Sequence, residues 1–276
     1  MDEEKIKKIV RESYGRVAKG ENSCCQSSVA TCCSSSKLNR KISSEIGYSI
    51  EEMDMVPEGS NLGLGCGNPV ALASLKEGEV VLDLGSGAGF DCFLAANKVG
   101  KNGKVIGVDM TPDMIEKARE NALKGNYSNV EFRLGEIENL PVADGIIDII
   151  VSNCVINLAP DKQRVFKESF RVLKPGGRLM VSDIVLTGNL PEAVKNSVAA
   201  YAGCMAGAVL KEDYITDIKS AGFTDVKVLE ENIFPIKYIA NDSTVLAFKN
   251  DLNLSEDEIE YLSRTILSIK VAALKE

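Results

Sequence analysis

Runs rich in apolar residues recur through the middle of the chain, and stretches with helical spacing separate them. The runs lie at residues 79–85, 104–110, 130–136, 146–154 and 178–185. The helical stretches lie at residues 90–99, 112–121 and 161–173. Short apolar runs are typical of strands that are buried on both faces of a parallel sheet. Their alternation with helices predicts an α/β fold with a doubly wound, mostly parallel sheet.

The two ends of the chain follow looser patterns. Apolar residues at helical spacing predict an amphipathic helix over residues 3–19. Residues 255–276 open with a capping box, Ser255 and Glu258, and predict a terminal amphipathic helix. Between residue 186 and that helix, the pattern predicts helices at 191–202 and 211–221 and strands at 225–231 and 244–249. These two strands would complete a sheet of seven.

Composition narrows the class of protein. The 276 residues, 45% of them hydrophobic, suffice for one large domain or for one domain with an appendage. The net charge of −8 disfavours nucleic acid and an anionic membrane surface as partners. No apolar run reaches the roughly 20 residues that span a bilayer, and the N-terminus lacks the apolar core of a signal peptide. We therefore expect a cytoplasmic protein.

The chain has no histidine and eight cysteines. The absence of histidine removes Ser–His and Cys–His nucleophile pairs and the commonest neutral metal ligand. Eight cysteines in a cytoplasmic protein favour reduced thiols with ligand or redox roles over a disulfide framework. The alternative is that several are small buried hydrophobic residues. The cysteines are Cys24, Cys25, Cys32, Cys33, Cys66, Cys92, Cys154 and Cys204.

A glycine-rich loop, LDLGSGAGFD at residues 82–91, stands between a predicted strand and a predicted helix. Gly85, Gly87 and Gly89 allow the backbone to approach a ligand closely. Asp109 ends the next strand, 20 residues beyond Gly89, where a carboxylate accepts hydrogen bonds from ribose hydroxyls. A glycine pattern alone also suits an ordinary tight turn, but here the order of strand, loop, helix and acidic residue predicts a nucleotide site.

The charges around this loop distinguish two kinds of ligand. A dinucleotide would place its pyrophosphate at the helix N-terminus. Asp83 lies directly before the loop, and the acidic stretch GEIENLP follows the third strand at residues 135–141. Negative charge disfavours a phosphate and suits a cation such as the sulfonium of S-adenosylmethionine (SAM).

The motifs VLDLGSGAG, VDM, GEIE and LKPGG occur in this order, which resembles the class I SAM-dependent methyltransferases. The resemblance implies a Rossmann-like core with SAM as cofactor. It further implies that the methionine moiety lies along Asp83–Gly89, the ribose at Asp109 and the adenine at Glu136 and Ile137. Other cofactor-binding candidates are Gly85, Ser86, Gly87, Gly89, Met110 and Asn153. For Asn153, ordering the loop beside it is the alternative.

Three cysteines are placed where the acceptor of such an enzyme would lie. Cys154 ends the fourth strand, Cys204 lies in a glycine-flanked loop, and Cys66 lies in a glycine-rich turn before the sheet. A single cysteine at a strand end is usually a buried structural thiol. Trivalent arsenic, however, would use three thiolates as soft ligands, and its own lone pair needs no general base. This acceptor fits a chain without histidine.

The stretches NLGLGCGNP, VSNCVINLAPDK and GCMAGA resemble the arsenite SAM methyltransferases over residues 45–250. The resemblance implies that Cys154 and Cys204 bind As(III), that Cys66 joins them, and that arsenite and methylarsenite are substrates. It also implies disulfide exchange between Cys66 and an N-terminal cysteine, for which we favour Cys33 or Cys32, with thioredoxin or a small thiol as reductant. The cysteine pairs 24/25 and 32/33 have a second interpretation as a metal or metalloid capture site.

These inferences divide the chain into three expected parts. They are an N-terminal helix with a Cys/Ser-rich flexible segment at 1–60, a SAM-binding core at 61–186, and an As(III)-binding cap with sheet completion and C-terminal helix at 187–276. One rival function is methylation of a quinone or another small carbon acceptor, and another is thiol-based metalloid or zinc binding without catalysis. The oligomeric state stays open, with a monomer as the simplest expectation.

Overall fold

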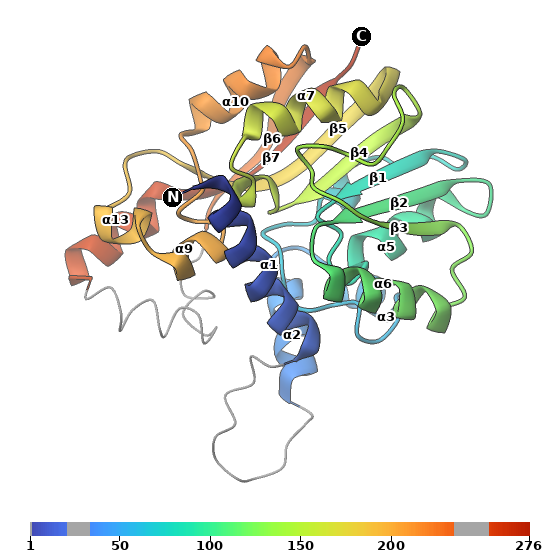
Figure 1. The fold of residues 1–276 in the computed structure, drawn as a ribbon, viewed down its shortest axis with the longest axis horizontal. Coiled ribbons are helices and arrows are strands. Elements are labelled where there is room, and N and C mark those ends of the chain that lie inside the picture. Colours follow the sequence, from blue (N-terminus) through green and yellow to red (C-terminus); the bar gives the residue numbers. More distant parts are fainter. Residues whose placement is uncertain (1, 21–33, 235–253) are drawn as a thin grey trace.

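The computed structural model describes residues 2–20, 34–234 and 254–276. Its strands form one seven-stranded sheet in the order β3-β2-β1-β4-β5-β7-β6 (Figure 1). Neighbours among β1 to β5 run parallel, and β7 is antiparallel to both β5 and β6. The strands are β1 Val80–Leu84, β2 Lys104–Asp109, β3 Val130–Leu134, β4 Ile147–Asn153, β5 Leu173–Leu186, β6 Thr224–Ile233 and β7 Ile266–Leu274. The predicted class of fold is confirmed.

The helices alternate with these strands as the sequence predicts. Around the sheet lie α4 Pro69–Leu72, α5 Phe90–Val99, α6 Pro112–Lys124, the 3-10 turn η1 Ile156–Leu158, α7 Lys162–Val172 and α10 Lys211–Ser220. Towards the termini lie α1 Glu3–Lys19, α2 Ser34–Glu45, α3 Ile50–Asp54, α8 Glu192–Lys195, α9 Val198–Ala202 and α13 Glu256–Thr265. The single helix predicted at 191–202 is two short ones, and α2 and α3 were not predicted. No helix in the described part of the chain is long and apolar enough to cross a membrane.

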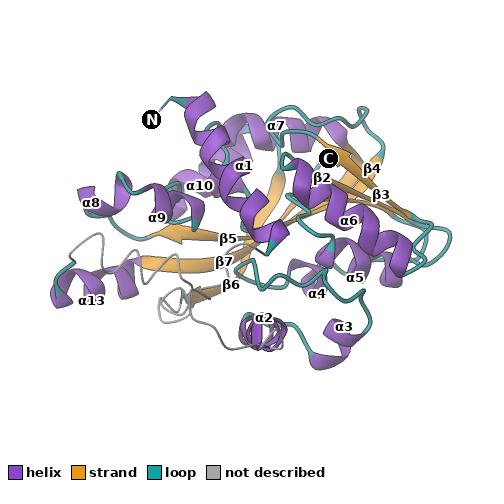
Figure 2. Ribbon diagram, turned by 60° about the horizontal axis from the view of Figure 1, so that its bottom comes forward, coloured by secondary structure: helices purple, strands orange, loops and turns teal. Residues whose placement is uncertain are grey.

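Strand residues alternate between two apolar layers, because successive side chains of a strand point to opposite faces. Leu82 of β1 packs in one cluster with Phe166 of α7 and Tyr214 of α10. Val81, its neighbour, packs in another cluster with Phe93 of α5. Helices therefore cover both faces, with α7 and α10 on one side and α4 and α5 on the other (Figure 2).

The terminal helix predicted over residues 255–276 is wrong beyond Thr265. The capping box of Ser255 and Glu258 does begin a helix, but this helix, α13, ends at Thr265 and the chain continues as β7. In β7 the side chains of Ile269, Val271 and Ala273 are buried and alternate with half-buried ones. Hydrogen bonds from β5 on one side and β6 on the other override the helical spacing, as tertiary context does for β-branched segments. The strand predicted at 244–249 lies outside the described residues.

The strand order places a ligand-binding edge between β2, β1 and β4. Ligands of open α/β sheets bind outside the carboxyl ends of the strands where the order reverses, and here β1 has β2 and β4 as neighbours. Helix α1 lies between α6 and α9 (Figure 1). It is tied to the loop after β3 by the ion pair of Lys7 with Glu136, 2.7 Å, and to the end of α9 by Tyr14, whose hydroxyl donates to the Ala202 carbonyl at 3.1 Å.

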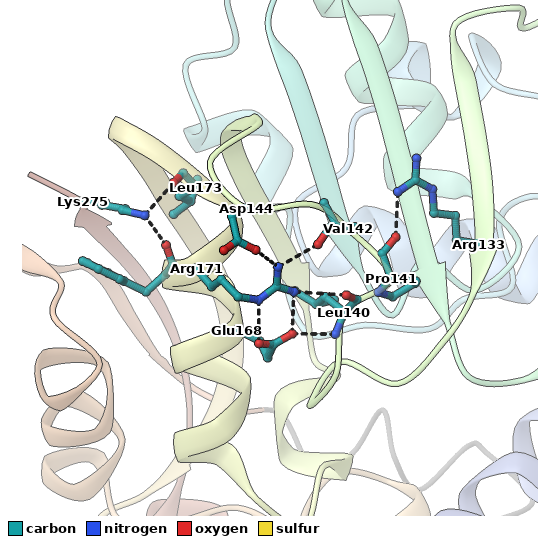
Figure 3. A network of polar contacts seen from close by, with 10 residues as sticks. Arg133, Leu140, Pro141, Val142, Asp144, Glu168, Arg171, Leu173 and Lys275 are labelled. Atoms are coloured by element: carbon teal, nitrogen blue, oxygen red, sulfur yellow. Dashed lines mark hydrogen bonds and ion pairs between the residues drawn. The ribbon is translucent and has the colours of Figure 1, made fainter.

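The loop that follows β3 is anchored by Arg171 of α7. Its guanidinium donates to the carbonyls of Leu140 and Val142, at 3.1 and 2.8 Å, and pairs with Glu168 and Asp144 (Figure 3). Glu168 in turn accepts from the Leu140 backbone N–H at 2.8 Å. These contacts fix the far end of a loop whose first residues reach the ligand-binding edge.

Candidate functional site

A cavity of about 270 Å³ lies at the carboxyl ends of β1, β2 and β4, with residues of α1 in its wall. Most of the predicted cofactor residues line it, together with two of the three predicted arsenic ligands. They are Asp83, Gly85, Ser86, Gly87, Asp109, Met110, Ile137, Asn153, Cys154 and Cys204. Gly89, Glu136 and Cys66 lie outside this lining.

The glycine-rich loop has the backbone conformation that the sequence predicts. Gly85, Gly87 and Gly89 have φ values of 67°, 51° and 94°, in the left-handed region that favours glycine. A Cβ on Gly85 would lie 2.3 Å from Cγ2 of Val155, whereas a Cβ on Gly87 would meet no atom within 4 Å. Gly85 is therefore required by the protein's own packing, while Gly87 faces open space.

Gly89 and Asp109 support this loop from two sides. A Cβ on Gly89 would lie 2.7 Å from the rings of Phe93 and Phe132, so this glycine serves packing at the start of α5. The Asp109 carboxylate accepts from the backbone N–H groups of Gly87, at 3.0 Å, and Thr111, at 2.8 Å. These bonds hold the end of β2 against the glycine-rich loop.

Three carboxylates in the wall of the cavity carry no compensating cation among the described residues. Burial raises the pKa of Asp91 to about 6 and holds the pKa of Asp83 well above its usual range, with the charge of Asp91 adding to the latter effect. Burial also raises the pKa of Asp109 against its two backbone hydrogen bonds. The described ion pairs include none of the three. Mutual repulsion and burial make this wall a site for a positively charged group.

Ser86 adds an unsatisfied polar group to the same wall. Its Oγ is buried and has no hydrogen-bond partner in the protein. Buried hydroxyls are nearly always hydrogen-bonded in native structures. The cavity therefore fits a positively charged ligand that has polar groups and that can occupy the open space at Gly87. SAM is such a ligand.

Asn153 orders the turn that carries Cys66, a role that differs from the two predicted for it, contact with the cofactor and ordering of the loop beside it. Its Oδ1 accepts from the Cys66 backbone N–H at 3.0 Å, and its Nδ2 donates to the Gly67 carbonyl and the Tyr48 hydroxyl, each at 2.8 Å. The side chain thereby binds the end of β4 to the turn before the sheet.

The two glycines beside Cys66 are explained by close contacts. A Cβ on Gly65 would lie 2.7 Å from Nδ2 of Asn153, and one on Gly67 would lie 2.1 Å from Oγ of Ser182. The backbone of the turn is thus pressed between the ends of β4 and β5. The Cys66 thiol, at the centre of this turn, contacts Ser182 Oγ at 3.8 Å.

Cys154 and Cys204 share an uncommon backbone conformation. Their φ values are 60° and 63°, in the left-handed region that costs a residue other than glycine about 1 kcal/mol or more. The Cys204 thiol donates to the Cys154 carbonyl at 2.8 Å. Such strain is concentrated at functional sites, where surrounding structure maintains it.

The structure brings the three predicted thiols to one buried place from three distant parts of the chain. Cys66, Cys154 and Cys204 all belong to one apolar cluster and are less than 10% exposed. Hydrogen bonding to Cys204 and to Cys66, together with burial, raises the pKa of Cys154 well above its usual range. Burial likewise raises the pKa of Cys66. The thiols of Cys66 and Cys154 lie within 4.8 Å of each other, and the raised pKa values of these two groups favour their protonated forms.

The remaining sequence-based predictions concern Glu136, Cys92 and the N-terminal cysteines. Glu136 faces α1, where it pairs with Lys7 at 2.7 Å and Arg11 at 3.5 Å, and the buried Glu138 lines the cavity in its place. Cys92 is fully buried in α5, as the structural interpretation of that residue predicts, and its thiol donates to Asp83 Oδ2 at 3.2 Å. Cys33 and the other N-terminal cysteines lie outside the described residues.

Two residues of the site were missed by the sequence interpretation. Asp91 is the second residue of α5, and its position after the last glycine of the loop could have indicated a third carboxylate. Tyr14 lines the cavity from α1, where burial and then the charges of Cys204 and Cys154 raise its pKa. The helical spacing over residues 3–19 predicts an apolar face that includes Tyr14, but such a pattern does not reveal which element the face covers.

Comparisons with known proteins identify the family of this chain. A family model described as a methyltransferase domain matches residues 75–222. The chain is 46% identical to an arsenite methyltransferase of Halobacterium salinarum over 98% of its own length and 68% of that protein, and 38% identical to the human arsenite methyltransferase over 63% of its own length. It spans only 48% of the human protein. Among solved structures, an arsenic(III) S-adenosylmethionine methyltransferase from Chlamydomonas reinhardtii superposes with a TM-score of 0.63 at 33% identity, covering 86% of this chain and 73% of that one. A protein with this sheet, this cavity and these relatives belongs to the arsenite methyltransferase family, on the class I SAM-dependent methyltransferase fold.

Proposed function

We propose that the protein methylates trivalent arsenic, with SAM as methyl donor and with the thiolates of Cys66, Cys154 and Cys204 as arsenic ligands. The observation that carries this proposal is the meeting of three buried thiols beside a cavity with an anionic wall. Arsenite and methylarsenite are the proposed substrates. The family relatives are named for arsenite methylation.

In the cofactor site, the carboxylates of Asp83 and Asp91 would face the positive charges of the methionine moiety, and Asp109 would accept from the ribose hydroxyls. Ser86 has a free hydroxyl for a further hydrogen bond, and Ile137 offers an apolar surface for the adenine. When bound, SAM supplies a methyl group on a sulfonium. The protein's own part is to compensate charge and to orient the ligand.

The pKa of Asp91 gives this site a pH dependence. Because burial raises that pKa to about 6, the carboxylate takes up a proton as the pH falls through this value, and the protonated form cannot compensate a cation. We expect SAM affinity to be nearly constant from pH 7 to 8 and to fall by up to about tenfold per pH unit below 6. Calorimetric titration with SAM from pH 5 to 8 measures this. In Asp91→Asn the step near pH 6 should be absent, and an equally steep fall there in both proteins would exclude Asp91 as its cause.

In the thiol site, binding of arsenite requires no base. Three As–S bonds replace three As–O bonds, and each departing hydroxide takes up one thiol proton and leaves as water. This balance suits thiols whose pKa values are raised by burial. The arsenic lone pair is then the nucleophile, which explains how a chain without histidine can methylate this acceptor.

Helix α1 keeps this chemistry away from bulk water. Tyr14 and Val10 of α1 line the cavity, and Lys7 binds both Glu136 and Glu138 of the loop after β3 at 2.7 and 3.4 Å. Exclusion of water protects As–S bonds from hydrolysis and strengthens electrostatic interactions at the site.

Close packing around Cys66 leads to a prediction about arsenic binding. Gly67→Ala would place a methyl group 2.1 Å from Ser182 Oγ and 3.2 Å from both Ser182 Cβ and Lys270 Cε. Rotation of the Ser182 hydroxyl relieves only the first contact, so we expect the turn to shift and to carry the Cys66 thiol away from its partners. We expect arsenite affinity to fall about 10- to 100-fold, while SAM affinity stays within about threefold, because misplacement by about 1 Å has such costs. Ser182→Gly in the same protein removes the obstructing side chain and should restore part of the affinity. Unchanged arsenite binding in Gly67→Ala would contradict the expected displacement of the Cys66 thiol.

We further propose that the enzyme is a monomer and works in the reducing cytoplasm. We also propose that its thiols pass through a redox cycle. Methylation formally oxidises the arsenic by two electrons, so thiols must return it to the trivalent state. Cys33 or Cys32 with Cys66 would form the disulfide, and thioredoxin or a small thiol would reduce it. A single methyl transfer to methylarsenite precedes the reduction step, so variants that lack the N-terminal cysteines should still methylate methylarsenite in one turnover.

The direct test is the reaction itself. Purified, reduced protein with SAM and arsenite should yield methylarsenicals, which liquid chromatography with elemental mass spectrometry identifies. Titration with SAM, with and without arsenite, separates the alternatives. A methyltransferase for a carbon acceptor would bind SAM but not arsenite, and a protein that only binds metalloids would bind arsenite but not SAM.

A further inference from the structure

A buried carboxylate adjoins two of the three thiols. The ligand atoms of Cys66, Cys154 and Asp183 all lie within 4.8 Å of one another, and the sulfur of Cys204 is not part of this group. All three residues are buried, and Asp183 is 0% exposed. We propose that Cys66, Cys154 and Asp183 form a site for a thiophilic divalent cation, Zn²⁺ in the first place, which competes with arsenite for the two shared thiols.

The ligand set matches the chemistry of zinc. Zinc binds thiolate sulfur and carboxylate oxygen at about 2.0–2.3 Å, and three protein ligands leave a fourth position for water. Ligand atoms of such a tetrahedron lie about 3.3–3.8 Å apart. From a starting separation of no more than 4.8 Å, small side-chain movements therefore close the site. Cys154 lines the cavity, which gives the cation a path of entry.

The carboxylate of Asp183 is held in place by its own hydrogen bonds. Its Oδ1 accepts from the Ile184 backbone N–H at 2.9 Å and from Asn157 Nδ2 at 2.8 Å, and its Oδ2 accepts from the Tyr214 hydroxyl at 3.1 Å. Partners of this kind orient the ligands of a metal and raise its affinity. Asn157 Oδ1 is itself buried without a hydrogen-bond partner.

Zinc and arsenic would select different third ligands from the same cluster. Trivalent arsenic is strongly thiophilic and gains a third As–S bond from Cys204. Zinc binds carboxylate oxygen as well as thiolate sulfur, and Asp183 offers it an anion without disturbing the hydrogen bond of Cys204 to the Cys154 carbonyl. Both ions would thus share Cys66 and Cys154. Cys204 would be specific to arsenic and Asp183 to zinc.

The proton balance also differs between the two ions. Binding of Zn²⁺ to two protonated thiols and one carboxylate forms two Zn–S bonds and one Zn–O bond and releases two protons to the buffer. Binding of arsenite releases none, because the thiol protons leave within three water molecules. Calorimetry in buffers of different ionisation enthalpy counts these protons directly.

The experiment compares Zn²⁺ and arsenite binding, each by calorimetry on the reduced full chain without SAM, in wild type, Asp183→Asn and Cys204→Ser. We expect Asp183→Asn to weaken Zn²⁺ at least about tenfold and to leave arsenite within about threefold, and Cys204→Ser to do the reverse. The zinc result stands on its own and does not depend on methyltransferase activity, so it can fail while the proposed function holds. Equal loss of both ions in Asp183→Asn, or undiminished Zn²⁺ binding there, would overturn the site.

A second measurement covers the case in which Asp183→Asn does not fold. Co²⁺ bound to wild type and to Cys204→Ser should show thiolate-to-metal charge-transfer bands of equal intensity, because Cys204 is not a ligand. Wild type should release two protons per Zn²⁺, and Zn²⁺ should inhibit arsenite methylation competitively with respect to arsenite. A weaker band in Cys204→Ser or release of three protons would assign the cation to the three thiols and refute the role of Asp183.

Discussion

Cys154→Ser will lose methylation of both arsenite and methylarsenite, by at least about a thousandfold in kcat/KM, while SAM affinity stays within about threefold. A thousandfold loss corresponds to about 4 kcal/mol of transition-state stabilisation. The Cys154 thiol lies within 4.8 Å of the Cys66 thiol, and the Cys204 thiol donates to the Cys154 carbonyl at 2.8 Å. Its removal therefore leaves two thiols without a third ligand, and a serine hydroxyl is a poor ligand for a soft centre.

The matched control is Cys92→Ser, the same substitution at another buried cysteine. Cys92 is 0% exposed and its thiol donates to Asp83 Oδ2, a bond that a serine hydroxyl can also make. We expect arsenite affinity in Cys92→Ser to equal that of the wild type. Fluorescence or calorimetric titration with arsenite, followed by product analysis with both substrates, measures the difference. Arsenic methylation at the wild-type rate by Cys154→Ser would contradict the assignment of this residue as a ligand.

The strand–helix alternation could be predicted because each buried strand is a local pattern. The runs that became β1, β2 and β4 need no knowledge of their neighbours to be recognised, since burial on both faces makes them continuously apolar. The segment that became β7 is different. Its spacing allows a helix or a strand, and only the places beside β5 and β6 decide between them.

The candidate site divides in the same way. The glycine-rich loop and Asp109 are close in sequence and were found by spacing, and the three cysteines were found through family resemblance. Tyr14 and Asp183 could not be assigned from sequence, because each acts through contacts with distant residues, Ala202 in one case and Tyr214 in the other. The role of Glu136 at the cofactor stays a prediction from the motif, and the ion pair with Lys7 of α1 is a contact that the motif does not reveal.

Gly85→Ala and Gly87→Ala should distinguish a glycine that the protein's own packing requires from a glycine that faces the space for a ligand. In both variants, alanine at a positive φ costs about 1–2 kcal/mol of folding stability. Gly85→Ala also forces a methyl group to within 2.3 Å of Val155 Cγ2, and overpacking adds about 1–3 kcal/mol. We expect a total loss of about 2–5 kcal/mol for Gly85→Ala and about 1–2 kcal/mol for Gly87→Ala, as measured by urea unfolding without ligand.

Although Gly87→Ala should be the more stable of the two variants, we expect a clear effect of this substitution on SAM affinity. A Cβ on Gly87 meets no protein atom within 4 Å, so its cost beyond backbone strain arises only when a ligand fills that space. Gly87→Ala should therefore lower SAM affinity at least about tenfold while remaining folded. An affinity equal to wild type would show that the cofactor does not lie against this part of the loop.

The contact between Gly85 and Val155 also links the cofactor loop to the arsenic site, because Val155 follows Cys154 directly. A double-mutant cycle with Val155→Gly, which removes every atom that the new methyl group would meet most closely, measures this link. If the clash causes the loss, the cycle should give a favourable coupling of about 1–3 kcal/mol in unfolding free energy, and arsenite affinity lost in Gly85→Ala should recover with it. Additive effects would assign the whole loss to the backbone conformation of Gly85 and leave the two loops energetically independent.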